Sequence, residues 1–153
     1  MQPAKAIQAI NEQISIYGKV VHGRKLGREL GFPTANINAD AGLLENGVYG
    51  VYVTTIKGNQ YRGIMNIGVK PTFESNLEKT IEVHLLDFHG DVYGEEIKCQ
   101  LLFKVRDERK FPSIEFLKHQ IKEDIHHANQ QFELAGAFRQ NTKGEFFKKE
   151  RIS

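Results

Sequence analysis

Between Tyr17 and Val105 the chain consists of short β-like runs separated by glycines, and no helical pattern interrupts them. We expect strands at Gly18–His22, Val48–Thr55, Tyr61–Val69, Thr80–Phe88 and Glu96–Val105. A turn signal, Lys57-Gly58-Asn59, stands between the second and third runs and predicts a hairpin there. Consecutive strands with no helices between them favour an antiparallel barrel or sandwich over a doubly wound sheet.

After Pro112 the apolar period becomes helical. One stripe of apolar residues recurs at spacings of three and four: Ile114, Leu117, Ile121, Ile125, Ala128 and Phe132. Ser113 suits the N-cap, Glu115 suits the first turn, and Gly136 suits the end of the helix. Because an isolated amphipathic helix is only marginally stable in water, we expect this stripe to pack on the barrel.

The two ends of the chain differ from this middle part. Ile7, Ile10 and Ile14 have the spacing of a short helix, so residues 1–16 read as a lead-in segment. Residues 136–153 carry more basic than acidic side chains and read as a basic tail, flexible or weakly helical. The 153 residues and 40% hydrophobic content are typical of one globular domain.

Charge and cysteine content exclude several classes of protein. Cys99 is the single cysteine, so no intrachain disulfide can form, and we expect an inert buried thiol in a reduced, cytoplasmic setting. The net charge is only +2, so the chain lacks the large positive charge that is typical of non-specific nucleic-acid binding. No apolar run approaches the roughly 18 residues of a membrane span. We therefore expect no membrane partner and no nucleic-acid partner, and we also expect a monomer.

The densest chemical signal is the segment GKVVHGRKLGRELGFPTAN, residues 18–36. Its glycines allow the backbone to approach an anion closely, and the basic side chains between them, such as Lys25 and Arg28, suit phosphates. Thr34 and Asn36 share one face if this stretch is extended, and their oxygens are hard ligands that suit Mg²⁺. The alternatives are a flexible basic loop and a turn begun by Pro33, in which the polar side chains satisfy the backbone.

At this point the sequence resembles a known family. GKVVHGRKLGRELGFPTANI is similar to the signature of riboflavin kinases, and the agreement extends through GVYGVYV, YRGIMNIGVKPTF, IEVHLLDF, DVYGEEI and RDERKF, over about residues 17–130. The resemblance implies a riboflavin kinase domain at 17–135 with a mainly β fold. The implied domain consists of a six-stranded antiparallel Greek-key β-barrel at about 17–105, a flavin-covering loop at 106–112 and a C-terminal α-helix at about 113–135. The resemblance also implies ATP-dependent phosphorylation of the riboflavin 5′-hydroxyl to FMN with Mg²⁺.

The resemblance also assigns roles to individual residues. In Thr80–Phe88, Glu82 alternates away from the apolar face formed by Ile81, Val83 and Leu85, and it matches the family's catalytic glutamate, a general base. The remaining matches are Thr34 and Asn36 for Mg²⁺ and nucleotide phosphate, Gly23 and Arg28 (with Lys25 as a rival) for the ATP-binding loop, Leu85, Asp87 and Tyr93 for the adenine end, and Arg106, Arg109 and Phe111 for the flavin loop.

Two alternatives concern the role of the whole chain. Many bacterial riboflavin kinases are the C-terminal half of a bifunctional FAD synthetase, but the His-x-Gly-His motif of nucleotidyl transfer is absent here, so we expect no FMN adenylyltransferase activity. The chain is then either a stand-alone kinase or a domain cut from a longer protein. The other alternative is a flavin-sensing or RNA-binding regulatory protein that retains the kinase fold, for which the basic tail is the support.

Overall fold

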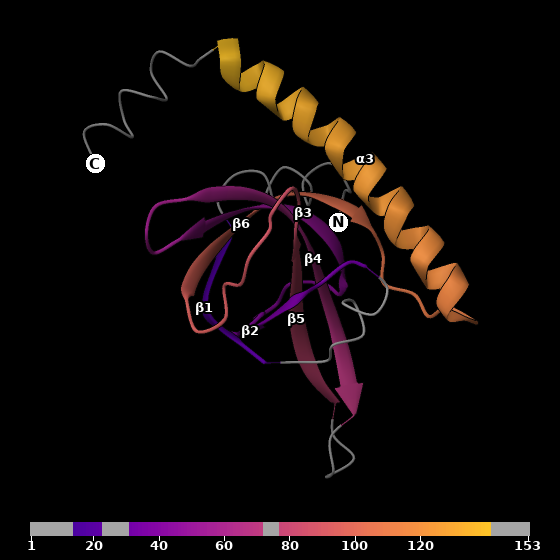
Figure 1. The fold of residues 1–153 in the computed structure, drawn as a ribbon. Coiled ribbons are helices and arrows are strands. Elements are labelled where there is room, and N and C mark those ends of the chain that lie inside the picture. Colours follow the sequence, from indigo (N-terminus) through magenta and orange to yellow (C-terminus); the bar gives the residue numbers. More distant parts are fainter. Residues whose placement is uncertain (1–13, 23–30, 72–76, 142–153) are drawn as a thin grey trace.

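In the computed structural model, which describes residues 14–22, 31–71 and 77–141, six strands close into a barrel and one long helix crosses its outside (Figure 1). The elements are β1 (Ser15–Val21), β2 (Ala35–Asn38), β3 (Gly47–Thr55), β4 (Gln60–Pro71), β5 (Leu77–Leu85), β6 (Glu96–Arg106) and α3 (Ile114–Asn141). The order around the barrel is β1-β2-β5-β4-β3-β6, and every pair of neighbours is antiparallel. Strand β6 returns to lie beside β3, next to the β3-β4-β5 meander, which is a Greek key. The predicted barrel is confirmed.

The predicted strands are all present, with shifted ends, and one further strand was not predicted from the pattern. Strand β2 has only four residues, Ala35–Asn38, so it is too short to show an alternating pattern. The predicted strand Thr80–Phe88 ends earlier, at Leu85. The reason is local: Asp87 has a φ of 52°, a left-handed conformation that an extended strand cannot contain.

The inside of the barrel is filled by side chains. The residues with the least exposed area in this core include Tyr49, Val51, Met65, Ile67, Val83, Cys99 and Leu101. Burial raises the pKa of the Cys99 thiol to about 12, in agreement with the prediction of an inert buried cysteine. Since the interior is packed, the barrel offers its outer surface and its connecting segments for binding.

Helix α3 packs on the outer face of β3, β4 and β6 through its middle. Ala128 and Phe132 are fully buried there, in a second apolar cluster with Val48, Tyr52, Ile64 and Leu86. The prediction that the whole stripe packs on the barrel is wrong at its beginning, because Ile114 is 53% exposed. The predicted stop at Gly136 is also wrong, because the helix continues to Asn141. One glycine costs a helix only about 1 kcal/mol, too little to end a helix of this length.

No helix within the described ranges is both long and apolar enough to span a membrane. Although α3 has 28 residues, charged side chains recur along it.

The approach of Phe103 to the backbone of Gly50 gives a prediction about stability. A Cβ at Gly50 would overlap the Phe103 ring, which cannot withdraw easily because it packs edge-on against Phe132 at 5.0 Å between centroids. We expect Gly50→Ala to lower the free energy of unfolding by about 1–3 kcal/mol, measured by urea denaturation. Gly136→Ala is the control: its Cβ meets open space in the helix, so it should be neutral or slightly stabilising. Equal effects of the two variants would contradict this account.

Candidate active site

Glu82 lies in a row of polar residues on the outer face of the barrel. On one side β5 pairs with β2, which sets Asn36 opposite Glu82, and on the other side β5 pairs with β4, which sets Asn66 opposite Glu82. Directly opposed residues of antiparallel strands share a face, with Cβ atoms about 5 Å apart. The next residue along β5, Ile81, is buried in the core, so the predicted alternation is confirmed. The result is a carboxylate flanked by two amides.

This row lines a cavity of about 380 Å³, here called the Glu82 cavity. It is bounded also by His22, which directly follows β1, by Gly68 and by Glu108. Glu108 lies so close to Gly68 that a Cβ at that position would overlap its carboxylate. The segment that follows β6 therefore reaches over β4 to the edge of the cavity that contains Glu82.

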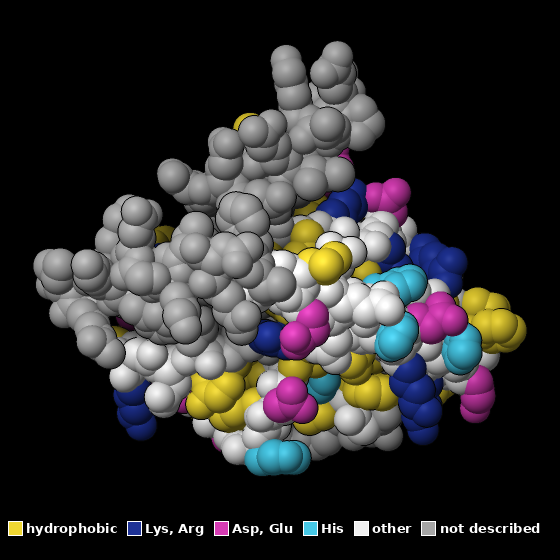
Figure 2. Space-filling view, turned by 90° about the horizontal axis from the view of Figure 1, so that it is seen from above, with side chains coloured by type: hydrophobic (Ala, Val, Ile, Leu, Met, Phe, Trp, Pro, Cys, Tyr) yellow, Lys and Arg dark blue, Asp and Glu magenta, His cyan; other side chains and the backbone are white. Residues whose placement is uncertain are grey.

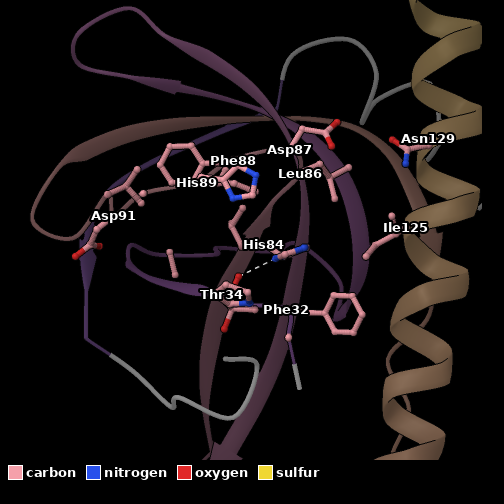
Figure 3. A pocket seen from close by; sticks show the side chains of 17 residues that line it. Phe32, Thr34, His84, Leu86, Asp87, Phe88, His89, Asp91, Ile125 and Asn129 are labelled. Carbon is pink, nitrogen blue, oxygen red and sulfur yellow. Dashed lines mark hydrogen bonds between the residues drawn. The ribbon is translucent and has the colours of Figure 1, made fainter. Parts of the chain in front are cut away.

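A second cavity, of about 590 Å³, lies between residues 31–35, residues 83–92 and α3 (Figure 3). Its wall is held together by His84, whose Nδ1 is 2.7 Å from the carbonyl oxygen of Pro33. The same imidazole meets the ring of Phe32 edge-on, with the centroids 5.8 Å apart. These contacts fix the segment that contains Thr34 against β5. Ile125 and Asn129 of α3 lie on the other side of the cavity.

The predicted metal ligands, Thr34 and Asn36, line different cavities. Thr34 lines the cavity of Figure 3, whereas Asn36 lines the Glu82 cavity. The Thr34 hydroxyl and the Asn36 amide oxygen are hard oxygen donors of the kind that Mg²⁺ takes, so the chemistry of these two residues fits the ion. Their assignment as its ligands stays a prediction.

The residues predicted for the adenine end are brought together only in part. Leu85 and Asp87 both line the cavity of Figure 3. Tyr93 does not line it: its ring stacks on His22, with centroids 3.7 Å apart and planes 19° apart. Gly23, Lys25 and Arg28 of the predicted ATP-binding loop lie outside the described residues.

Arg106, Arg109 and Phe111 do come together. The two guanidinium carbons lie 5.4 Å and 4.9 Å from the centre of the Phe111 ring. Arg106 Nε donates to both carboxylate oxygens of Asp124 at 2.8 and 3.0 Å, and its Nη2 donates to Oδ2 at 2.9 Å. The amide of Gln120 connects this pair to Arg109. Arg106 therefore ties the end of β6 to α3, a structural role that the sequence did not predict.

Two further ion pairs, both made by Lys104, anchor the same part of the chain. Lys104 Nζ lies 3.2 Å from Glu45 Oε2 and 2.5 Å from Asp107 Oδ1. The hydrogen bond to Asp107 raises the pKa of Lys104, and the same bond lowers the pKa of Asp107. The last residue of β6, Arg106, and the first residue after it, Asp107, are thus both held by ion pairs.

Four residues of this site were missed by sequence reasoning: Asn66, His84, Glu108 and Asp124. The alternation of the strand pattern places Asn66 and His84 on the polar faces of their strands, but it does not say which strands are neighbours. Asp124 had a clearer signal. It interrupts the apolar helical stripe between Ile121 and Ile125, and a carboxylate there needs a partner such as Arg106.

The fold and the site together define a closed six-stranded β-barrel with two cavities beside its strands, one of them lined by a carboxylate between two amides. Residues 10–132 match the Flavokinase family, described as riboflavin kinase. The chain belongs to the riboflavin kinase family, and the resemblance that its motifs suggested is confirmed.

Individual relatives agree with this assignment. The chain is 56% identical over 128 residues to the RNA-binding riboflavin kinase RibR of Bacillus subtilis (strain 168). The alignment covers 84% of this chain and 55% of that protein. It is 41% identical over 131 residues to a bifunctional riboflavin kinase/FMN adenylyltransferase of Buchnera aphidicola subsp. Schizaphis graminum, which covers 84% of this chain and 42% of that protein. This chain thus spans about half, or less, of the curated relatives that it matches.

A solved structure supports the fold as well. The crystal structure of riboflavin kinase from Trypanosoma brucei aligns with a TM-score of 0.59 at 26% sequence identity. The alignment covers 80% of this chain and 82% of that one. The fold is therefore shared over about four fifths of each chain.

Proposed function

We propose that this chain catalyses transfer of the γ-phosphoryl group of ATP to the 5′-hydroxyl of riboflavin, giving FMN and ADP. The observation that carries the proposal is the position of Glu82 between Asn36 and Asn66, at the wall of a cavity, in a chain of the riboflavin kinase family. A carboxylate at such a place can accept a hydrogen bond from an alcohol and take its proton.

Glu82 acts as the general base in this proposal. It orients the 5′-hydroxyl and takes its proton while the alcohol oxygen forms a bond to the γ-phosphorus. The bond from that phosphorus to the β,γ-bridging oxygen breaks, and ADP leaves with that electron pair. Thr34 and Asn36 would hold Mg²⁺, which supplies neutralisation of the phosphate charge when bound. Gly23, Lys25 and Arg28 are proposed for the phosphates.

The remaining predicted residues take supporting roles. Leu85 and Asp87, which share a cavity, and Tyr93 are proposed for the adenine end of the nucleotide. Phe111 and Arg109 are proposed to cover the flavin ring. Arg106 is proposed to hold these two residues in place, because its guanidinium is hydrogen-bonded to Asp124 and lies over the Phe111 ring.

The proposal is tested by incubating the purified chain with riboflavin, ATP and Mg²⁺ and separating the flavins by chromatography. We expect FMN and no FAD, because the proposed site transfers a phosphoryl group and not an adenylyl group. Absence of FMN under conditions in which the protein is folded would overturn the kinase proposal. FMN that does not depend on added ATP would overturn the phosphoryl donor.

A second candidate function is RNA binding, and one observation favours it: the relative with 56% identity is named an RNA-binding riboflavin kinase. The sequence-based expectation of no nucleic-acid partner therefore stays open. On the described surface shown in Figure 2, acidic and basic side chains alternate without an area of one sign. Salt-sensitive retention of RNA by the full chain, lost when residues 142–153 are deleted, would support this function beside the kinase activity.

A further inference from the structure

The row through Glu82 continues across the barrel beyond Asn66, where its next residue, Val48, is apolar. Val48 of β3 lies opposite Asn66, and Arg106 of β6 lies opposite Val48. Five neighbouring strands thus contribute one residue each to a single row on the outer face, in the order Asn36, Glu82, Asn66, Val48 and Arg106. The row begins with an amide, passes the carboxylate, and ends at the cation that lies over the Phe111 ring.

This order gives the row a direction. At its first end Asn36 adjoins the segment that contains Thr34. These two residues are the ones proposed for the metal and the nucleotide phosphates. At its other end Val48 belongs to the apolar cluster under α3, and Arg106 adjoins Phe111. A flat aromatic substrate fits the second end and a phosphate chain fits the first. Asn66 therefore lies on the acceptor side of Glu82, where the chain that carries the reacting alcohol would run.

The amide of Asn66 is suited to bind that chain. Its Oδ1 is buried, and among the described residues it has no hydrogen-bond partner. Its side chain lines the Glu82 cavity. Glu108 lines the same cavity, and its carboxylate lies next to Gly68, two residues further along β4. A carbonyl oxygen accepts hydrogen bonds only, so the group that it takes from a substrate is a donor such as a hydroxyl.

We propose that Asn66 is a substrate-binding residue that determines specificity for a hydroxylated chain: its Oδ1 accepts a hydrogen bond from a secondary hydroxyl of the acceptor, and this holds the terminal hydroxyl against Glu82. The inference rests on the proposed kinase function and deepens it. A site that has such an acceptor discriminates against an analogue without the hydroxyl, because the buried oxygen is then left unpaired.

The experiment compares two acceptors in the wild-type chain and in Asn66→Ala. One is riboflavin, and the other is a flavin with an unbranched 5-hydroxypentyl chain, which keeps the terminal alcohol and lacks the secondary hydroxyls. The wild-type chain should prefer riboflavin in kcat/KM. Asn66→Ala should lower kcat/KM for riboflavin about tenfold to a hundredfold and leave the value for the analogue within about threefold, so that the preference disappears. Affinity for Mg²⁺·ADP, measured by calorimetry, should not change.

A further variant separates a binding role from damage to the fold. Gln100→Ala removes a half-buried strand amide that does not line the Glu82 cavity, and it should keep the preference for riboflavin. A preference retained in Asn66→Ala overturns the inference. A wild-type chain inactive with both acceptors would instead refute the kinase proposal.

Discussion

Glu82→Gln is expected to lower kcat for FMN formation by about 10²- to 10⁴-fold, the usual contribution of a well-placed general base. Glutamine has nearly the same shape and can still donate and accept hydrogen bonds, but it cannot take the proton of the alcohol. The rest of the catalytic effect, which comes from positioning and charge stabilisation, stays in place. Some turnover above the uncatalysed rate should therefore remain.

The measurement needs kcat and the two binding affinities together. Riboflavin binding can be followed by flavin fluorescence and Mg²⁺·ADP binding by calorimetry, and both should stay within a few-fold of the wild-type values. Glu96→Gln is the matched control, because Glu96 is an exposed strand glutamate at the beginning of β6 and lines neither of the two candidate-site cavities. Nearly full turnover in Glu82→Gln with normal binding would show that another group takes the proton.

The orientation of Glu82 could be predicted from the sequence, but its surroundings could not. Alternation within Thr80–Phe88 was enough to turn Glu82 away from the core, and this orientation is a local property of one strand. The row that flanks it depends on which strands are neighbours: β2 and β5 are adjacent although more than 40 residues separate Asn36 from Glu82. Strand β2 was itself too short to be recognised. The position of Asn66 opposite Glu82 is therefore known only from the strand register.

The part of the helix that packs on the barrel could not be predicted either, for a different reason. The apolar stripe correctly predicted a helix against the barrel, but the period of a helix does not say where along its length the barrel lies. Among the side chains of α3 that the structure describes, Ala128 and Phe132 are the only buried apolar ones. The segment before them is held instead by a charge, since Asp124 is 3% exposed and binds Arg106 from the end of β6. This pair connects the predicted flavin loop to the helix.

Asp124→Ala is expected to lower the free energy of unfolding by about 3–5 kcal/mol, the usual cost when one partner of a buried ion pair is removed. The Arg106 guanidinium would remain largely buried, with a side chain only 20% exposed, and would lose three hydrogen bonds to the carboxylate. Urea denaturation at neutral pH, followed by circular dichroism, measures the effect. Glu133→Ala is the control: it removes an exposed ion pair with Arg62 and should cost less than about 1 kcal/mol.

The double variant Arg106→Leu/Asp124→Leu separates stability from function. It removes both charges from a largely buried place, so it should recover much of the stability that Asp124→Ala loses. Its KM for riboflavin should nevertheless rise, because Phe111 and Arg109 lose the guanidinium that links their segment to α3. If the double variant were as unstable as Asp124→Ala, the unpaired charge would not be the cause of the loss. If it bound riboflavin normally, the ion pair would stabilise the fold without positioning the proposed flavin loop.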